Sequence, residues 1–267
     1  MTVSLQNYER AVLMAFLPEE RRKKILEILN ENGSVTIEEL ARRFGVSEMT
    51  VRRDLDRCRV TGRLERCRGG AVLRGENVGE EDYSKKRSAN LEVKQRIAAC
   101  CAGLVTGGMQ VFLDAGTTTF AIAQELLAVP SLTFLTNDLK TALFLSRHRR
   151  EVIILGGTIQ NSTGSAVGSL TLEMMGSFFV DVAFVGTACI NEDFDVLTPT
   201  IEKAFMKRAV LRSAKECFLV ADSSKFHRSA LVRINSLSDY TAVVTDYRFN
   251  EEEKRLAESK KIELIQV

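Results

Sequence analysis

Hydrophobic positions in the first quarter of the chain recur at helical spacing in three short segments. The first covers residues 18–30, where a proline and two glutamates suit the first turn of a helix. The second opens at Thr36, whose spacing to Glu39 is that of a capping box. The third follows Gly45 and Ser47, which favour a helix end and a helix start. We therefore predict three helices, the last two joined by about four residues, which is the helix-turn-helix arrangement.

The third predicted helix divides its side chains between two faces. Val51 and Leu55 stand four positions apart and form a narrow apolar face with Val46. In a helix-turn-helix the last helix docks in the major groove, so the side chains that point elsewhere are predicted to face DNA. These are Glu48, Met49, Thr50, Arg52 and Arg53, with Ser47 at the start of the helix and Arg57 one turn further on. An ordinary solvated amphipathic helix has the same pattern, and this stretch alone leaves that alternative open.

A hairpin is predicted directly after this helix. Residues 64–73 read as two short strands around Arg68-Gly69-Gly70, where two glycines permit the positive φ angles of a tight turn. Arg63, Arg66 and Arg68 are placed to reach phosphate or a minor groove. A hairpin that follows a helix-turn-helix is typical of a wing.

The second part of the chain has a different pattern. Residues 76–90 contain almost no apolar side chain, and we interpret them as a linker whose charges are solvated. Beyond it, helical segments alternate with short β-rich runs, which predicts a mainly parallel α/β sheet with any ligand at the carboxyl ends of the strands. The runs are residues 110–114, 132–136, 152–155, 182–185, 217–221, 242–245 and 262–265. The predicted parts are an extension (1–17), a winged helix-turn-helix (18–75), the linker (76–90) and an α/β domain (91–267).

Charge is spread unevenly over the 267 residues, although the net charge is only +2. Residues 1–75 hold 15 Lys and Arg against 11 Asp and Glu, a net of +4, whereas the remainder holds 22 against 24, a net of −2. Residues 42–74 contain ten Arg, no Lys and four acids, a net of +6. This local excess suits a surface that contacts phosphate, so nucleic acid is the predicted partner.

Cysteine and histidine give no sign of a metal or a cofactor. The six cysteines form no C-x-x-C pair, and the two histidines are isolated, so we expect reduced structural thiols and no metal site. No apolar run reaches the roughly 18–20 residues of a membrane helix. Residues 11–17 are apolar but lack a small-residue cleavage site, which makes them a poor signal peptide. We expect a cytoplasmic protein, and whether translation starts at Met1 or Met14 stays open.

The predicted strand ends carry candidate ligand-binding residues. The loop Asp114-Ala-Gly-Thr-Thr-Thr119 opens a helix, so hydroxyls and free amides lie together as a phosphate requires. Such residues also make ordinary turns, but several of these loops at one sheet edge favour a pocket for a small phosphorylated ligand. The candidates are Asp114, Gly116, Thr117, Thr118, Thr119, Thr136, Asn137, Gly156, Gly157, Thr187 and Lys225, the last closing over the phosphate.

Residues 20–75 resemble the winged helix-turn-helix of DeoR-family transcriptional regulators. The matching residues are Val46-Ser47, Thr50-Val51-Arg52-Arg53-Asp54-Leu55, Gly62, Leu64, Arg66 and Gly69-Gly70-Ala71, with departures at Cys58 and Cys67. Residues 91–250 resemble the sensor domain of that family, which is similar in fold to ribose-5-phosphate isomerase. The matches are Lys94 with Ile97-Ala98, Phe112-Leu-Asp-x-Gly-Thr-Thr118, Thr136-Asn137, Leu155-Gly-Gly157, Asp181-x-Ala-Phe184, Lys207 and Asp222-Ser-Ser-Lys-Phe226. The resemblance adds Lys207 to the effector-binding candidates, and residues 189–195 depart from its glycine-bearing loop.

A sugar-phosphate isomerase is the alternative. Isomerisation needs a general base near a carbon-bound proton, and the isomerases supply carboxylates where this chain has Gly186-Thr187-Ala188-Cys189. Only Glu192, Asp193 and Asp195 are left to substitute, so we assign no catalytic residue. We expect a transcriptional regulator of carbohydrate metabolism genes, a repressor in preference to an activator, that binds operator DNA as a dimer or tetramer and responds to a phosphorylated sugar.

Overall fold

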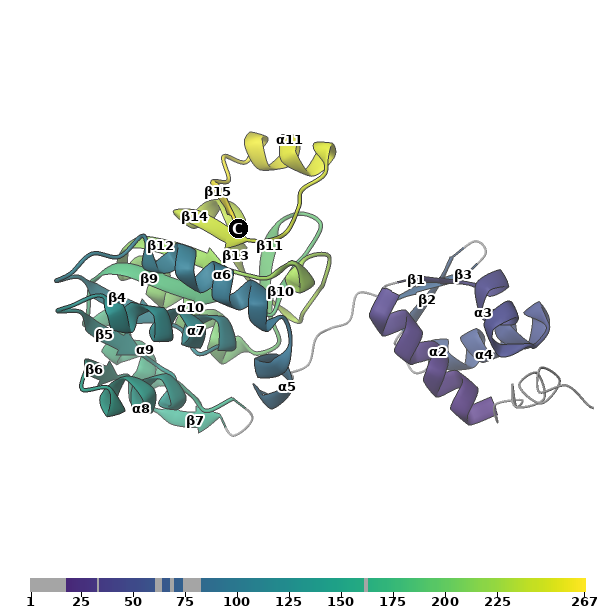
Figure 1. The fold of residues 1–267 in the computed structure, drawn as a ribbon, viewed down its shortest axis with the longest axis horizontal. Coiled ribbons are helices and arrows are strands. Elements are labelled where there is room, and N and C mark those ends of the chain that lie inside the picture. The colour runs from purple at the N-terminus through teal and green to yellow at the C-terminus, as the bar shows by residue number, and fades with distance from the viewer. Residues whose placement is uncertain (1–17, 33, 61–63, 68–69, 74–82, 161–162) are drawn as a thin grey trace, which may run out of the picture. The chain divides into compact units, whose positions relative to one another are not determined.

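A computed structural model describes residues 18–32, 34–60, 64–67, 70–73, 83–160 and 163–267 (Figure 1). The chain divides into two compact units, residues 1–76 and residues 77–267. Within the described ranges, no helix combines the length and apolarity that crossing a membrane would need. Each unit has its own hydrophobic core, as the change of sequence pattern between them predicts.

The first unit is a three-helix bundle with a small antiparallel sheet in the order β1-β3-β2. The predicted helices and the hairpin are present, and the wing strands pair from Leu64 opposite Leu73 to Cys67 opposite Gly70. Strand β1 was not expected, because its three residues read as a helix break and a cap. The elements are α2 (Pro18–Asn32), β1 (Ser34–Thr36), α3 (Ile37–Phe44), α4 (Glu48–Val60), β2 (Leu64–Cys67) and β3 (Gly70–Leu73).

Local capping contacts set the helix boundaries in this unit. Thr36 Oγ1 accepts a hydrogen bond from the Glu39 amide at 3.1 Å, which starts α3. Gly45 ends α3 with φ of 62°, a left-handed conformation that glycine adopts without steric cost. Ser47 Oγ then accepts from the Thr50 amide at 3.2 Å and starts α4. These contacts confirm the predicted turn and fix the direction in which α4 leaves it.

A buried ion pair joins α4 to α2. Asp54 Oδ2 lies 2.6 Å from Arg21 Nε, and the two side chains are 5% and 8% exposed. Burial of a charge is costly unless it is paired and hydrogen-bonded, so each of these groups depends on the other. Asp54 therefore belongs to the packing of the unit, on the same side of α4 as the buried Val51 and Leu55.

The second unit is built on a seven-stranded sheet in the order β15-β14-β12-β9-β4-β5-β6, and every neighbouring pair is parallel. All seven predicted runs supply one strand each, which confirms the predicted fold class. The strands are β4 (Gln110–Leu113), β5 (Thr133–Thr136), β6 (Glu151–Ile154), β9 (Val180–Gly186), β12 (Ala214–Val220), β14 (Ala242–Thr245) and β15 (Leu264–Gln266).

Helices cover both faces of this sheet, and alternate strand residues feed two separate cores (Figure 1). Val182 and Phe184 point to the core that contains residues of α6, α7 and α8. Ala183 and Val185 point to the core that contains residues of α9, α10 and α11. Strands buried on both faces read as continuous apolar runs, which is why the sequence revealed them. The helices are α6 (Leu91–Ala102), α7 (Thr117–Glu125), α8 (Leu139–Arg147), α9 (Ser169–Gly176), α10 (Ile201–Arg212) and α11 (Glu251–Ser259).

Several short elements of the second unit were not predicted. Two small antiparallel sheets are formed by β7 (Thr158–Gln160) with β8 (Ser165–Val167), and by β10 (Cys189–Ile190), β11 (Asp195–Thr198) and β13 (Val232–Ser236). Helix α5 (Tyr83–Ser88) lies inside the segment that we interpreted as a linker with solvated charges. That interpretation missed α5 because its sequence has almost no apolar periodicity to detect.

The ion pair in the first unit yields a stability prediction. Replacing Asp54 by Asn removes the buried carboxylate that pairs with Arg21 and lies 3.9 Å from Arg22, so the opening free energy of α2 and α4 should fall by about 3–5 kcal/mol. Native-state hydrogen exchange of the amides in both helices measures that quantity. The matched control is Arg52→Ala, which removes an exposed pair with Glu48 at 3.5 Å and should cost less than about 1 kcal/mol. Equal small losses in both variants would contradict a structural role for Asp54.

Candidate functional site

The structure separates the side chains of α4 into a buried and an exposed set. Val51, Asp54, Leu55 and Cys58 are buried against the rest of the unit. The exposed set contains most of the predicted DNA contacts: Ser47, Glu48, Met49, Arg52, Arg53 and Arg57. Because these positions are available and the buried ones are not, α4 presents one polar, arginine-bearing face.

Thr50 differs from the other candidates on α4. Its side chain is only partly exposed, and its Oγ1 lies 3.0 Å from Ser47 Oγ. Arg52 Nη2 lies 3.5 Å from Glu48 Oε2, one turn earlier on the helix. The neighbouring Arg53 is exposed. In the wing, Arg66 belongs to β2, and Arg68 lies outside the described residues.

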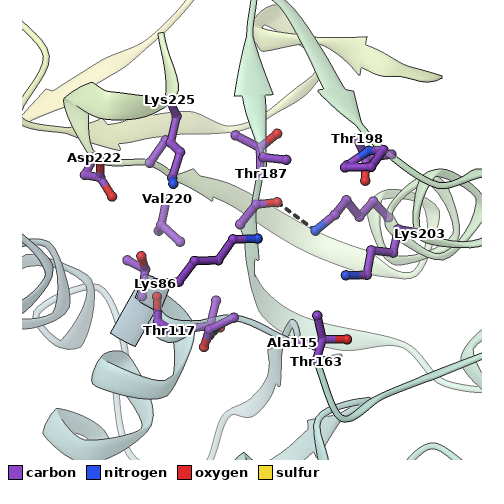
Figure 2. A pocket seen from close by; sticks show the side chains of 18 residues that line it. Lys86, Ala115, Thr117, Thr163, Thr187, Thr198, Lys203, Val220, Asp222 and Lys225 are labelled. Carbon is purple, nitrogen blue, oxygen red and sulfur yellow. Dashed lines mark hydrogen bonds between the residues drawn. The ribbon is translucent and has the colours of Figure 1, made fainter. Parts of the chain in front are cut away.

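A pocket lies at the carboxyl ends of the central strands of the second unit (Figure 2). Strands β5 and β6 extend the sheet on one side of β4, and β9, β12, β14 and β15 extend it on the other. The strand order therefore reverses between β4 and β9, and such switch points are where open α/β sheets bind ligands. Seven predicted residues line the pocket: Gly116, Thr117, Thr118, Thr119, Thr187, Lys207 and Lys225.

The floor of the pocket is the turn that leads from β4 into α7. Thr117 begins α7, so the amides of its first turn have no partner within the helix. The Thr119 side chain is fully buried, and its hydroxyl donates to the carbonyl oxygens of Asp114 (2.6 Å) and Gly116 (3.0 Å). Thr119 therefore shapes the turn, whereas the partly exposed Thr117 and Thr118 are the hydroxyls available to a ligand.

Behind this turn lies a buried ion pair. Lys207 Nζ contacts Asp114 Oδ2 and also donates to the Gly186 carbonyl at 2.7 Å. The Gly186 amide in turn donates to Asp114 Oδ2 at 3.2 Å. These contacts tie together the end of β4, the end of β9 and the middle of α10. Asp114 and Lys207 thus hold the pocket in shape, and only Lys207 also lines it.

Thr136 and Asn137, at the end of β5, support the same turn from the other side. Thr136 Oγ1 donates to the Leu113 carbonyl at 2.7 Å, and Asn137 Oδ1 accepts from the Ala115 amide at 3.2 Å. Both side chains are buried, and neither lines the pocket. The sequence predicts that these two residues contact a ligand. In the structure they instead support the turn between β4 and α7 from behind the pocket wall.

The expectation that Gly156 and Gly157 share this site is corrected by the structure. They follow β6, the last strand of the sheet, and border a different hollow beside α9. The Thr171 hydroxyl donates to the Gly156 carbonyl at 2.7 Å, and Gly157 has φ of 145°. A side chain at Gly157 would collide with Thr171 and with the Val167 carbonyl, so the glycine serves the packing of α9 against the loop.

Lysines that the sequence interpretation did not include complete the pocket. Lys86 comes from α5 and Lys203 from α10, and both extend into the space that Lys225 also faces (Figure 2). Lys203 precedes Lys207 by four residues, and this i, i+4 spacing on one helix face was a detectable signal. No comparable signal marks Lys86, which stands in a polar run. Thr163, Thr198 and Asp222 also line the pocket without having been predicted as ligand contacts.

The three acids that the sequence left as substitutes for the isomerase carboxylates, Glu192, Asp193 and Asp195, do not line this pocket. Glu192 and Asp193 are exposed, and Asp195 pairs with Arg233 at 2.8 Å. The carboxylate that does line the pocket belongs to Asp222, which accepts hydrogen bonds at 3.0 Å from Asn90 Nδ2 and from the Ser224 amide. Among the described residues, no three His, Cys, Asp or Glu side chains are grouped to hold a metal ion.

A winged helix-turn-helix joined to an α/β unit with a lysine-lined pocket defines the class of DNA-binding regulators that carry a small-molecule sensor. Sequence comparison identifies the family. Residues 21–76 match the DeoR-like helix-turn-helix domain, and residues 89–247 match the DeoR C-terminal sensor domain. The chain belongs to the DeoR family of transcriptional regulators, as the sequence resemblance indicated.

Relatives of similar length support this assignment. The HTH-type transcriptional regulator GlpR of Haloferax volcanii is 32% identical over 243 residues, which cover 91% of this chain and 95% of the relative. The glycerol-3-phosphate regulon repressor of Escherichia coli is 33% identical over 228 residues, which cover 85% of this chain and 90% of the relative.

Among solved structures, ribose 5-phosphate isomerase A from Methanocaldococcus jannaschii matches with 17% identity and a TM-score of 0.39 over 52% of this chain and 55% of that one.

The pair behind the pocket yields the second prediction. Lys207→Met leaves the Asp114 carboxylate buried without its cation, so the free energy of unfolding of the sensor unit should fall by about 3–5 kcal/mol. Denaturant unfolding followed by tyrosine fluorescence measures it, because three of the four tyrosines, Tyr83, Tyr240 and Tyr247, belong to this unit. Lys215→Met, at the exposed opposite end of β12, is the control and should change the value by less than about 1 kcal/mol. A similarly small decrease in the free energy of unfolding for Lys207→Met would show that the pair does not stabilise the pocket.

Proposed function

We propose that this regulator is a repressor of carbohydrate metabolism genes whose hold on operator DNA changes when a phosphorylated sugar or a related phosphoester occupies the sensor pocket. The observation that carries the proposal is the convergence of Lys86, Lys203 and Lys225 on the first turn of α7 (Figure 2). A phosphomonoester bears a charge of about −1.5 to −2 near pH 7, which lysines and free helix amides both favour.

The lining around these lysines suits a polar, neutral body attached to the phosphate. Thr163, Thr187 and Thr198 contribute hydroxyl-bearing side chains to the pocket wall, and Pro199 and Val220 contribute apolar surface. Sugars present hydroxyls on a carbon frame, so both kinds of lining find a counterpart. The names of the relatives are consistent with this ligand class, since one is a glycerol-3-phosphate regulon repressor.

We further propose that the pocket binds its ligand without transforming it. A general base needs to lie within hydrogen-bond reach of the proton that it removes. Asp222 already accepts hydrogen bonds from Asn90 and Ser224, and Asp114 is held by Lys207 behind the pocket wall. Both carboxylates are thereby committed to the framework. Incubation of the protein with ribose 5-phosphate tests this part, and formation of the corresponding ketose phosphate would contradict it.

The identity of the effector can be tested directly. A ligand that binds only the folded protein raises its melting temperature. We expect a thermal-shift screen of the full chain to respond to at least one member of a panel containing glycerol 3-phosphate, fructose 1-phosphate, fructose 6-phosphate and glucose 6-phosphate, and not to the corresponding unphosphorylated compounds. An equal rise in melting temperature with glycerol and with glycerol 3-phosphate would show that the pocket does not recognise the phosphate.

On the DNA side, we propose that α4 enters the major groove and that the wing contacts the backbone. One helix-turn-helix reads only a short site, so we expect a homodimer or a tetramer on a two-fold symmetric operator. The operator can be isolated by selecting duplexes from a random-sequence library with the purified protein. The spacing of two half-sites in the selected sequences then reports the symmetry of the assembly.

Replacement of Arg53 and replacement of Arg68 should have different effects on DNA binding in this assay. If Arg53 reads a base edge and Arg68 contacts phosphate, Arg53→Ala should reduce the preference for the selected duplex by about 1–3 kcal/mol. Arg68→Ala should instead weaken the selected and random duplexes alike and flatten the salt dependence of binding. Fluorescence anisotropy with both duplexes at several salt concentrations measures the two effects. The assignment fails if the two variants lose affinity equally for cognate and random DNA.

The lysine of the β12 loop gives a prediction for the effector. Lys225 belongs to the short 3-10 helix η2 (Ser223–Lys225), and within the described residues its ammonium takes no salt bridge. A charge-assisted hydrogen bond contributes about 1.5–3 kcal/mol, so Lys225→Ala should weaken effector affinity by roughly 10- to 150-fold. Operator affinity without effector should stay near that of the wild type.

Titration of operator binding with the phosphoester found in the screen, for both proteins at one salt concentration, measures this effect. Lys215→Ala serves as the control for removal of a lysine from the same stretch of chain, because that residue is exposed at the far end of β12. An unchanged midpoint in Lys225→Ala would take the residue out of the site. Loss of operator binding without effector would show that its role is structural.

A further inference from the structure

Helix α5 takes part in the pocket although it lies in the segment of chain that follows the DNA-binding unit. Its six residues come immediately before α6, and the chain between the helix and the first unit is only residues 77–82. The Lys86 side chain lines the pocket and extends toward the centre of the space that Lys203 and Lys225 also face (Figure 2). A ligand that fills the pocket therefore meets a side chain of this helix.

A buried lysine of the sensor unit holds the end of α5. Lys94, on α6, is 4% exposed, and its Nζ donates to the Ala89 carbonyl at 2.6 Å and to the Lys86 carbonyl. The last carbonyls of a helix have no partner within it, and a cation there satisfies them and opposes the helix dipole. Burial lowers the pKa of Lys94, and the charge of Asp222 acts in the opposite direction. An ammonium group placed under its carboxyl end thus helps to fix the position of α5.

Two more contacts link α5 and its following turn to opposite walls of the pocket. The Arg87 guanidinium lies 5.9 Å from the centroid of the Phe120 ring, and Phe120 follows the three threonines of the α7 turn. Asn90 Nδ2 donates to Asp222 Oδ1 at 3.0 Å. These contacts of the described side chains are polar or involve a cation, so charges close to the pocket contribute to the placement of α5.

We propose that α5 is the element through which the DNA-binding unit senses an occupied pocket, with Lys86 as the ligand contact and Lys94 as the positioning residue. The inference rests on the proposed function, because it requires an anionic ligand. A phosphate that binds Lys86 adds an anchor to α5 and restrains the end of the chain segment that leads to the first unit. A ligand shifts an equilibrium only through different affinities for its states, and Lys86 supplies such a difference at α5.

The chain provides a matched control for this mechanism. Lys86 and Lys225 both line the pocket, but Lys225 sits on η2, at the end of β12 and far from the linker in sequence. Removal of either lysine takes one positive charge from the same site. If α5 transmits the signal, the two variants should lose ligand affinity alike and differ in what saturating ligand does to DNA binding.

The experiment compares the full-length wild type, Lys86→Ala and Lys225→Ala. The DNA is the duplex selected by the wild type, and the probes are glycerol 3-phosphate and fructose 1-phosphate, each titrated until binding saturates in every variant. The measured quantity is the ratio of operator dissociation constants with and without saturating probe. Hydrogen exchange of the amides in residues 83–90 is recorded under the same conditions.

We expect both variants to bind the probe at least about 10-fold more weakly. At saturation, wild type and Lys225→Ala should show the same ratio, within the 5- to 150-fold range that is common for coupled sites. In Lys86→Ala the ratio should fall toward one, and the probe should no longer slow exchange in residues 83–90. A Lys86→Ala protein that switches at saturation as fully as Lys225→Ala would overturn the inference and leave the proposed function intact.

A wild type that binds neither probe, or whose operator affinity neither probe changes, would instead overturn the proposed function for these phosphoesters and the inference with it. Lys94→Met adds a test of the positioning residue that does not depend on a ligand contact. It should speed exchange in residues 83–90 before any probe is added, while the amides of the β4 and β9 strands keep their protection. Unchanged exchange in α5 would remove Lys94 from this role.

Discussion

The pocket depends on one constraint, which is that the Asp114 carboxylate and the Lys207 ammonium are both taken out of water. Neither charge is tolerated there alone, so the end of β4 and the middle of α10 have to meet where the two groups touch. The Gly186 amide and carbonyl join the same contact and bring in the end of β9. The turn that presents Thr117 and Thr118 is therefore positioned by electrostatics behind it, and Lys86, Lys203 and Lys225 line the pocket in front of it.

A buried ion pair also organises the DNA-binding unit, where it fixes the orientation of α4. In the run Arg52-Arg53-Asp54, the two arginines are exposed and the aspartate is buried against Arg21. A charged run on a helix thus contains both the residues that we propose face DNA and the one that fixes the orientation of the helix. Because Asp54 anchors α4 to α2, the buried ion pair sets which side of α4 is turned inward and so leaves the adjacent Arg53 exposed.

The sequence was sufficient for the layout but not for the order of the strands. Seven apolar runs predicted seven parallel strands, because central strands buried on both faces leave a continuous hydrophobic signal, and the edge strands β6 and β15 are also rich in apolar residues. Which strand ends adjoin each other depends on the sheet order, which pairs β4 with β9 and places β6 at the edge. This is why Thr117 and Thr187 line one pocket while Gly156 and Gly157 pack against α9. Neither β10, which has two residues, nor β13 forms a long uninterrupted apolar run, so the pattern that revealed the strands of the large sheet does not mark them.

Helix α5 shows why a site can include residues that no pattern marks. Its sequence lacks the apolar stripe that makes most helices detectable, and short helices are unstable in water without tertiary contacts. Among the described side chains, those contacts include the Lys94 ammonium at its carboxyl end and Arg87 against Phe120. A helix held by a large apolar surface would be insensitive to one added anion. Because polar contacts of Lys94 and Arg87 help to hold α5, an anion bound at Lys86 would add one more contact of the same kind.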